Sequence, residues 1–241
     1  MSAPIIFDKN LLKMRYERAD RNNFLVNDAK QLLDERLTYV KRSFKDIYEL
    51  TRFDEILPPE EAQFDLIKSS LQLHFINDLV GVLAQSWRAL RPDGLFLANF
   101  FGGETLPELR QVFAEAAPDS MMPRISPFID VKDAGALLQR TGFALPVVDS
   151  EKIEIVFDSA FHLMRFLRGI GETNALVKQH KGLTGKDFMM RVAQIYSEKF
   201  SEDGGVLATF EILTMTGWKP APNTPQPLKR GSAKANLGDF L

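Results

Sequence analysis

The sequence has 241 residues, 45% hydrophobic and 26% charged, so it can bury a substantial core. A formal net charge of −2 gives no overall attraction to nucleic acid or to an anionic membrane. The absence of cysteine excludes disulfides, thiolate metal sites and a cysteine nucleophile, and it fits a reducing compartment.

The first 20 residues do not have the pattern of a secretory signal, which is a basic start, an apolar stretch and a small-residue cleavage site. No stretch approaches the roughly 20 apolar residues of a membrane helix. We therefore expect a bacterial cytoplasmic protein with no integral membrane segment. A mitochondrial matrix location stays open, because these first residues are basic and somewhat amphipathic.

Residues 1–43 are predicted to form an N-terminal helical segment. Within them, residues 25–40 carry apolar side chains at helical spacing, with Asn27 or Asp28 as the start of the helix. The arginines of residues 5–23 either lie on a solvated face or meet an acidic partner, and the solvated face is favoured.

Residues 64–103 predict the centre of a sheet. Residues 64–71 have the composition of a strand, and Asn77 or Asp78 can begin the helix that follows. Pro92, Asp93 and Gly94 predict a turn. The apolar residues 95–101 then predict a strand buried on both faces, lying parallel to and beside strand 64–71.

The second half of the chain continues this alternation. Thr105 and Glu108 have the spacing of a capping box, and Asp130 and Gly142 bound another helix. Further predicted elements are a strand at 151–157, a helical lobe at about 159–200, a last strand at 207–218 and an extended tail at 220–241. Strands alternating with helices favour a mostly parallel α/β sheet.

Two segments of the central unit carry a family resemblance. FDLIKSSLQLHFINDL at 64–79 and LRPDGLFLANFFGGETLPELR at 90–110 resemble class I S-adenosylmethionine-dependent methyltransferases of the type 11 group. LRGIGETNAL at 167–176 and ATFEILTMTGWKP at 208–220 are similar to the alphaproteobacterial and mitochondrial family of complex I assembly factor 5. The biotin-pathway malonyl-carrier methyltransferases are more distantly similar.

The resemblance implies a Rossmann-like fold, S-adenosylmethionine as cofactor, and a protein as substrate or partner. For the close relatives it implies modification of a protein arginine, by methyl transfer or by hydroxylation on the same scaffold. The C-terminal strand of such a sheet is antiparallel to the others.

One part of the family pattern is missing. The family has a glycine-rich loop after its first strand, where the backbone lies against the cofactor, and an acidic residue after the next strand. In this sequence the first glycine is Gly81, and residues 44–50, which resemble the first strand, lead almost directly to residues 52–63. A βαβ unit needs about 30 residues. The sequence therefore predicts an incomplete fold: residues 44–219 form a truncated methyltransferase-like domain from which the first βαβ region and the cofactor loop are deleted.

The resemblance also implies which residues face the ligands. On the cofactor side these are Asp54, Ser69, Ser70, Leu71 and His74. Asp54 is either an adenine contact or a solvated loop acid. His74 is the catalytic candidate, as a general base or a substrate-orienting group, and a purely structural histidine is the alternative. On the substrate side the resemblance points to Gly102, Gly103, Arg124, Ser126, Glu172 and Asn174.

Two functions fit these observations. The chain is either a methyltransferase-family enzyme or a non-catalytic scaffold or assembly factor that binds a protein partner. The missing cofactor segment favours the second. The three scattered histidines predict no metal site, and no basic face with interleaved aromatic residues predicts nucleic-acid binding.

Overall fold

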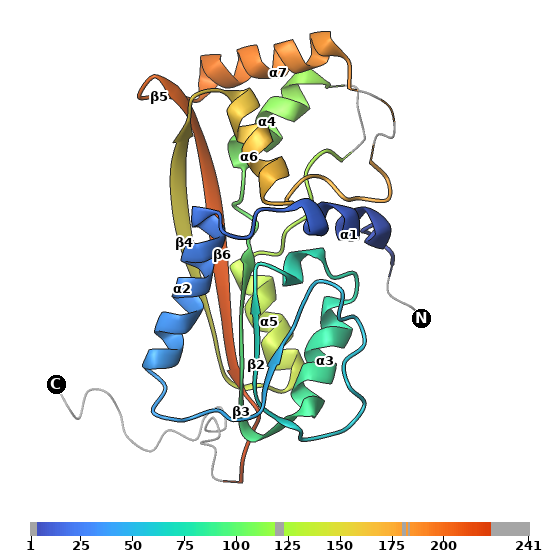
Figure 1. Cartoon of the computed structure of the whole chain (residues 1–241), viewed down its shortest axis with the longest axis vertical. Coiled ribbons are helices and arrows are strands. Elements are labelled where there is room, and N and C mark those ends of the chain that lie inside the picture. The colour runs from blue at the N-terminus through green and yellow to red at the C-terminus, as the bar shows by residue number, and fades with distance from the viewer. Residues whose placement is uncertain (1–3, 119–122, 180–181, 183, 223–241) are drawn as a thin grey trace, which may run out of the picture.

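The computed structural model describes residues 4–118, 123–179, 182 and 184–222, and it is built on one six-stranded sheet (Figure 1). The strand order is β1-β2-β3-β6-β4, and β5 also pairs with β6. The strands are β1 (Ile47–Glu49), β2 (Phe64–Ser70), β3 (Leu90–Phe101), β4 (Ala144–Phe157), β5 (Ser201–Glu202) and β6 (Gly205–Trp218). Most of the predicted tail, residues 223–241, lies outside the described residues.

The strand directions confirm the predicted fold class. β1, β2 and β3 pair in parallel, with Ile67 opposite Phe96, so the predicted pairing of strands 64–71 and 95–101 is confirmed. β6 is antiparallel to its neighbours β3, β4 and β5. Five strands therefore run in one direction and β6 runs against them, as a Rossmann-like sheet with an antiparallel C-terminal strand requires.

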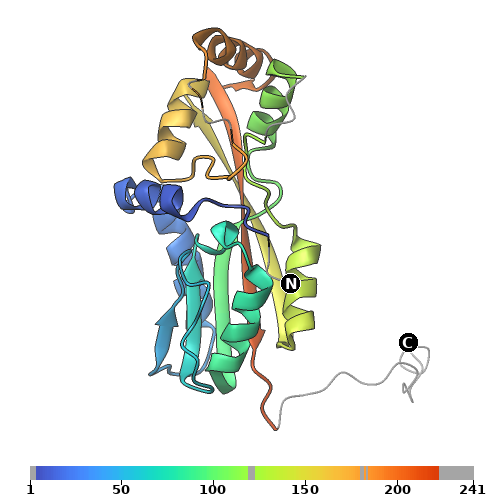
Figure 2. The ribbon, with the colours of Figure 1, turned by 90° about the vertical axis from the view of Figure 1, so that its right-hand side faces the viewer.

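Helices cover both faces of the sheet. They are α1 (Lys9–Arg18), α2 (Phe24–Thr38), α3 (Leu79–Ala89), α4 (Pro107–Ala116), α5 (Val131–Thr141), α6 (Ala160–Gly169) and α7 (Lys186–Lys199), with a short 3-10 helix η1 (Leu73–Phe75). In the side view of Figure 2, α1 and α2 lie on one side of the sheet, and α3 and α5 lie on the other. Leu33 of α2 packs on Leu66 and Leu97, so α2 supplies the apolar cover of β2 and β3 on its side.

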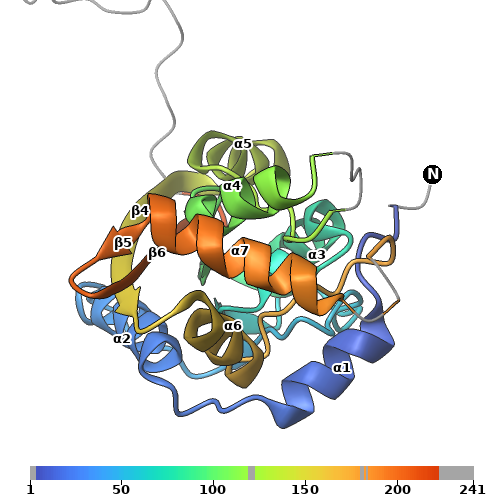
Figure 3. The same ribbon diagram turned by 90° about the horizontal axis from the view of Figure 1, so that it is seen from above.

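A second core lies at the upper end of the molecule. There β4 and β6 extend beyond the other strands, and α4, α6 and α7 gather around them, with α4 and α6 on opposite sides of α7 (Figures 1 and 3). Leu163, Val192 and Phe210 belong to this core. α6 and α7 lie within the range predicted as a helical lobe, and the division of the chain into domains stays a prediction.

Several helix ends were predictable and others were not. Asp78 caps α3 and Asp130 caps α5, as predicted, and Gly142 ends α5 with a φ of 93°. α2 begins earlier than expected, because the side chain of Asn23 accepts a hydrogen bond from the backbone N–H of Leu25. The prediction of Asn27 or Asp28 as its start was wrong.

The predicted capping box at α4 was also wrong. The helix follows Leu106, which has a φ of 53°, and no side chain caps it. The Glu108 carboxylate instead accepts hydrogen bonds from the backbone N–H and the hydroxyl of Thr209. Thr105 donates its hydroxyl to the carbonyl of Glu211 at 3.1 Å, so both residues fasten α4 to β6.

Two strand predictions were too short. β4 begins at Ala144 rather than near residue 151, because it pairs with β6 along nearly its whole length. Residues 92–94 are not a separate turn. They belong to β3, at an irregularity where the pairing moves from Phe64–Leu90 to Leu66–Leu95.

The chain between β1 and β2 is short and irregular, and β1 forms one edge of the sheet. Residues 50–63 form neither helix nor strand. The chain turns directly after β1, where the Asp54 carboxylate accepts hydrogen bonds from the backbone N–H of Thr51 at 2.6 Å and from its hydroxyl at 2.8 Å. Leu57 is buried against α3, and its N–H donates to Gln85. No βαβ unit therefore follows β1.

Candidate functional site

A buried cluster of three ionisable side chains lies beyond the carboxyl ends of β1 and β2. An Nη atom of Arg52 lies 3.1 Å from one carboxylate oxygen of Glu172, and Nε2 of His74 lies 2.8 Å from the other. The side chains of Arg52, Glu172 and His74 are 3%, 8% and 0% exposed. The carboxylate thus joins three segments that are far apart in the sequence.

Residues around Arg52 fix its position. Its Nε donates to the side-chain oxygen of Gln72 at 2.7 Å, and an Nη donates to the carbonyl of Leu71 at 2.9 Å. The guanidinium lies 4.6 Å from the ring centre of Phe75 and 5.0 Å from that of Tyr16, at distances that allow cation–π attraction. Leu71 has a φ of 51°, an uncommon conformation for this residue type.

Burial and charge set the protonation of the cluster. Burial lowers the pKa of His74 below its usual range, against the opposite influence of the neighbouring Glu172. Burial by itself would raise the pKa of Glu172, but His74 and Arg52 outweigh it and the pKa is lowered. A neutral His74 that donates from Nε2 to an ionised Glu172 satisfies both directions, and its Nδ1 then has no partner among the described residues.

A small crevice lies on one side of the cluster. Its floor is the carboxyl ends of β1 and β2, where ligands bind in open α/β sheets, and its cover comes from α1 and α2. It has a volume of about 180 Å³. The lining includes Arg21, Lys30, Glu49, Arg52, Ser70, Leu71 and Glu172.

A larger cavity of about 270 Å³ lies on the other side of the cluster. Its walls are mainly aromatic and aliphatic, and Glu172 lines both spaces. The predicted substrate-side residues Arg124, Ser126 and Asn174 also line it. The structure therefore brings four of the six predicted substrate-side residues to one cavity.

Comparisons with known proteins agree with this architecture. The model of the type 11 methyltransferase domain matches residues 16–98. The chain is 43% identical over 191 residues to a protein of Danio rerio named arginine-hydroxylase NDUFAF5, mitochondrial, covering 78% of this chain and 59% of that protein. It is 36% identical over 215 residues to a malonyl-[acyl-carrier protein] O-methyltransferase of Nitrosospira multiformis, covering 88% of this chain and 66% of that protein.

The chain belongs to the type 11 methyltransferase family. It spans only about three fifths of the length of the curated relatives described above. Among solved structures, a putative methyltransferase of Bacillus halodurans aligns with a TM-score of 0.51 at 13% identity, covering 78% of this chain and 99% of that one. This likeness shows the shared methyltransferase fold.

The crevice residues of this family member do not fit S-adenosylmethionine. The crevice is smaller than the roughly 300–1,000 Å³ of typical small-molecule pockets. Leu50, Thr51 and Arg52 follow β1 where a close backbone approach needs glycine. The guanidinium of Arg52 forms part of the inner wall, and its positive charge opposes a positively charged sulfonium.

The other predicted cofactor-side residues are mostly occupied. Asp54 holds the turn after β1 and does not line the crevice. The Ser69 hydroxyl donates to the carbonyl of Leu50 at 2.7 Å and so ties β2 to β1. Ser70 and Leu71 do line the crevice, and the Ser70 hydroxyl oxygen is buried without a hydrogen-bond partner among the described residues.

The two predicted substrate-side glycines have structural contacts instead. The N–H of Gly102 donates to the carbonyl of Glu211 at 2.9 Å, and that of Gly103 donates to the carbonyl of Ile129 at 2.9 Å. A Cβ at Gly102 would lie 2.4 Å from the Glu211 carboxylate. The close approach of β6 therefore explains why Gly102 is glycine.

Three residues of the site were missed in the sequence. Arg52 lay in a segment predicted as loop, although an arginine directly after a strand was a usable signal. Arg15 was assigned to a solvated face, but its guanidinium donates to the carbonyls of Thr173 and Asn174. Asn99 is fully buried within β3, and its side chain contacts the backbone of both Leu71 and α2.

Two further properties bear on the family member's environment. Among the residues that the structure describes, no three His, Cys, Asp or Glu side chains gather as metal ligands would. Within the same residues, no helix combines the length and the apolar character needed to cross a bilayer. The name of the Danio rerio relative describes that protein as mitochondrial.

Proposed function

We propose that this chain is a non-catalytic member of the methyltransferase family that acts by binding a protein partner, as an assembly factor. One observation carries the proposal. The chain turns directly from β1 into residues 50–63, and Arg52 fills the position beside the carboxyl ends of β1 and β2 that a cofactor would need. An enzyme of this family has to align a methyl donor with its substrate, which requires a bound cofactor.

The identity to the relatives described above supports a role near theirs. The assembly factor 5 resemblance points to respiratory complex I as the assembly that the partner belongs to. We further propose the bacterial cytoplasm or the mitochondrial matrix as the compartment, since the chain has no cysteine and the Danio rerio relative is named as mitochondrial.

Titration with S-adenosylmethionine tests the loss of the cofactor site. We expect no heat of binding and no change in the unfolding temperature, while the protein still unfolds cooperatively. Saturable binding would overturn the proposal. A hundredfold excess over Kd stabilises a folded protein by about 2.7 kcal/mol, or roughly 5–11 °C for a chain of this size. The Nitrosospira multiformis methyltransferase is the positive control.

A genetic experiment tests the assembly role. We expect deletion of the gene to lower the amount of assembled complex I, and the wild-type gene to restore it. Restoration by a Glu49→Gln variant is also expected, because a crevice carboxylate has no role in the absence of a cofactor. An unchanged amount of complex I in the deletion strain would contradict the assembly role.

The rival function is an enzyme that modifies a protein arginine. The pairing of His74 with Glu172 beside the larger cavity favours it, since a carboxylate and an imidazole could bind a guanidinium. However, Arg52 already pairs with this carboxylate, and Glu172 is the only acidic residue among those that line the cavity. Methylation or hydroxylation of a peptide arginine by the purified chain would establish the rival.

A further inference from the structure

The larger cavity is part of a continuous space at the upper end of the molecule. A side cavity of about 250 Å³ shares Phe113, Arg124 and Ile125 with it. An outer groove of about 450 Å³ shares Arg110, Pro123 and Ile125 with the side cavity. Because Ile125 lines all three, a ligand can extend from the groove into the interior.

The interior of this space is apolar. Its walls include the rings of Phe75, Phe101, Phe113, Phe128 and Phe210, together with Met164. The outer groove is lined by Ile5, Ile6, Ile125, Leu176 and three prolines. Ile5 is 75% exposed, so part of this apolar surface faces solvent. An apolar chain would gain about 0.8 kcal/mol for each CH₂ group that it buries here.

The charged residues around this space are almost all positive. Arg110, Arg124, Arg168 and Lys178 line it, and none has a carboxylate within 4.0 Å among the residues that the structure describes. The single acid of the lining, Glu172, is neutralised by Arg52. The space therefore has an unbalanced positive charge beside an apolar interior.

Arg124 is held where it can meet an anion. Its guanidinium lies 4.2 Å from the ring centre of Phe188 and 5.8 Å from that of Phe113. Its Nε is buried without a hydrogen-bond partner among the described residues. Arg110 lines the same side cavity, so two guanidinium groups flank the entrance to the interior.

We propose that this space binds an amphipathic anion, a molecule with one apolar chain and a carboxylate or phosphate head. The chain lies in the aromatic interior, and the head lies in the side cavity between Arg124 and Arg110. The geometry excludes a cationic head, which would face four positive side chains, and it favours an anionic head over a neutral one, because guanidinium groups bind carboxylates and phosphates in a bidentate manner.

This inference goes beyond the proposed function and does not depend on it. The loss of the cofactor crevice concerns the opposite side of Glu172, and the anion would bind whether or not S-adenosylmethionine does. Failure of the experiment below would leave the cofactor titration unaffected, so the two proposals can fail separately.

The test is a set of calorimetric titrations of the full chain with four probes of equal chain length. Dodecanoate and dodecyl phosphate are the anions, dodecanol is the neutral control and dodecyltrimethylammonium is the cationic control. We expect one anion to bind per chain, the alcohol to bind roughly tenfold or more weakly, since a charge-assisted hydrogen bond is at stake, and the cation not to bind. Vesicles of an anionic phospholipid form a fifth arm that distinguishes a membrane surface from a free amphiphile.

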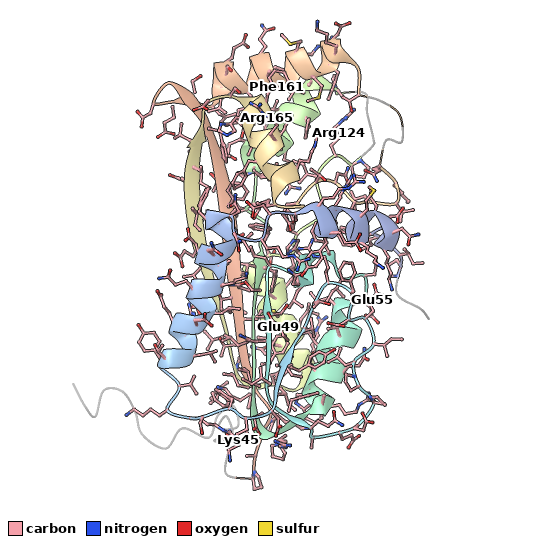
Figure 4. The ribbon with its side chains drawn as sticks, viewed as in Figure 1. Lys45, Glu49, Glu55, Arg124, Phe161 and Arg165 are labelled. Atoms are coloured by element: carbon pink, nitrogen blue, oxygen red, sulfur yellow. The ribbon has the colours of Figure 1, made fainter. Side chains whose placement is uncertain are left out.

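Two arginines provide a matched pair of variants. Arg124→Gln removes the charge that faces the side cavity, and we expect it to weaken dodecanoate binding roughly tenfold or more. Arg165→Gln is the control, because Arg165 lies on α6 and does not line any of the three spaces (Figure 4). The control is expected to bind dodecanoate as the wild type does.

A second measurement does not depend on the arginines. The chain has no cysteine, so Ser126→Cys introduces a single thiol in the wall of the interior, where Ser126 is 6% exposed. Dodecanoate at ten times its Kd leaves about one tenth of the sites free and should slow alkylation of this thiol about tenfold. Equal binding of the alcohol and the acid, equal affinity of the two arginine variants, unprotected alkylation, or binding to vesicles alone would each overturn the proposal.

Discussion

Nε2 of His74 lies 2.8 Å from a carboxylate oxygen of Glu172, and both side chains are almost completely buried. The pair joins η1, which follows β2, to residues that follow α6. Because Arg52 holds the other oxygen of the same carboxylate, the three residues connect the incomplete side of the sheet to the upper helices. The stability of the truncated fold should therefore depend on them.

Replacement of Arg52 by methionine tests this dependence. Arg52→Met leaves the buried carboxylate of Glu172 without its positive partner, and breaking a buried pair in this way costs about 3–5 kcal/mol. Urea unfolding should show the loss. The control is Arg36→Met, which breaks the half-exposed pair with Asp149 and should cost about 1 kcal/mol or less. Equal costs would contradict the structural role of the cluster.

The buried His74 should make the fold sensitive to mild acid. Its folded-state pKa lies below the unfolded value of about 6.5, so below that pH the unfolded chain binds a proton that the folded chain does not. Stability should therefore fall as the pH drops below about 6.5, by up to about 1.4 kcal/mol per pH unit. The lowered pKa of Glu172 acts in a separate, more acidic range, below its usual value of 4.5.

Urea unfolding between pH 7 and pH 5 measures this slope. The variant for comparison is His74→Gln, since glutamine can still donate a hydrogen bond to Glu172 and does not titrate in this range. We expect its stability to change less between these pH values than that of the wild type. A slope that is the same in both proteins would show that other groups cause it.

The strands and helices of the centre were predictable because their sequence patterns are local. Residues 64–71 and 95–101 are continuous apolar runs, and Asp78 and Asp130 are strong helix-capping residues directly before periodic segments. The missing βαβ region could also be predicted, because chain length alone limits what can follow residue 50. These features need no knowledge of distant contacts.

The polar contacts of the site could not be predicted in this way. Arg52 and Glu172 are 120 residues apart, and nothing in the local sequence pairs them. The same holds for Glu108, whose carboxylate is bonded to Thr209 of β6 rather than to its own helix end. When such a residue has a local role and a distant one that exclude each other, the folded chain decides between them.

Asn99 is a further buried polar residue whose contacts are distant. Its side-chain oxygen accepts a hydrogen bond from the N–H of Leu71 at 3.2 Å, and its amide nitrogen donates to the carbonyl of Ala29 in α2. Asn99→Leu should leave the Ala29 carbonyl unpaired and cost about 1–3 kcal/mol. Asn27→Ala removes an exposed amide that bonds to Asn22, so thermal unfolding of this control should be nearly unchanged.

Gly102 distinguishes a structural glycine from one that faces a ligand. An alanine Cβ there would lie 2.4 Å from the Glu211 carboxylate and 2.6 Å from Leu213, so Gly102→Ala should cost about 1–3 kcal/mol in unfolding free energy. The matched control is Gly169→Ala, because Gly169 lies in α6 with nothing within 4 Å of its added Cβ. Alanine should be neutral there or stabilise the helix by up to about 1 kcal/mol. If Gly102→Ala instead unfolds like the wild type and weakens only the binding of dodecanoate, then Gly102 faces the ligand and the substrate-side prediction for it was right.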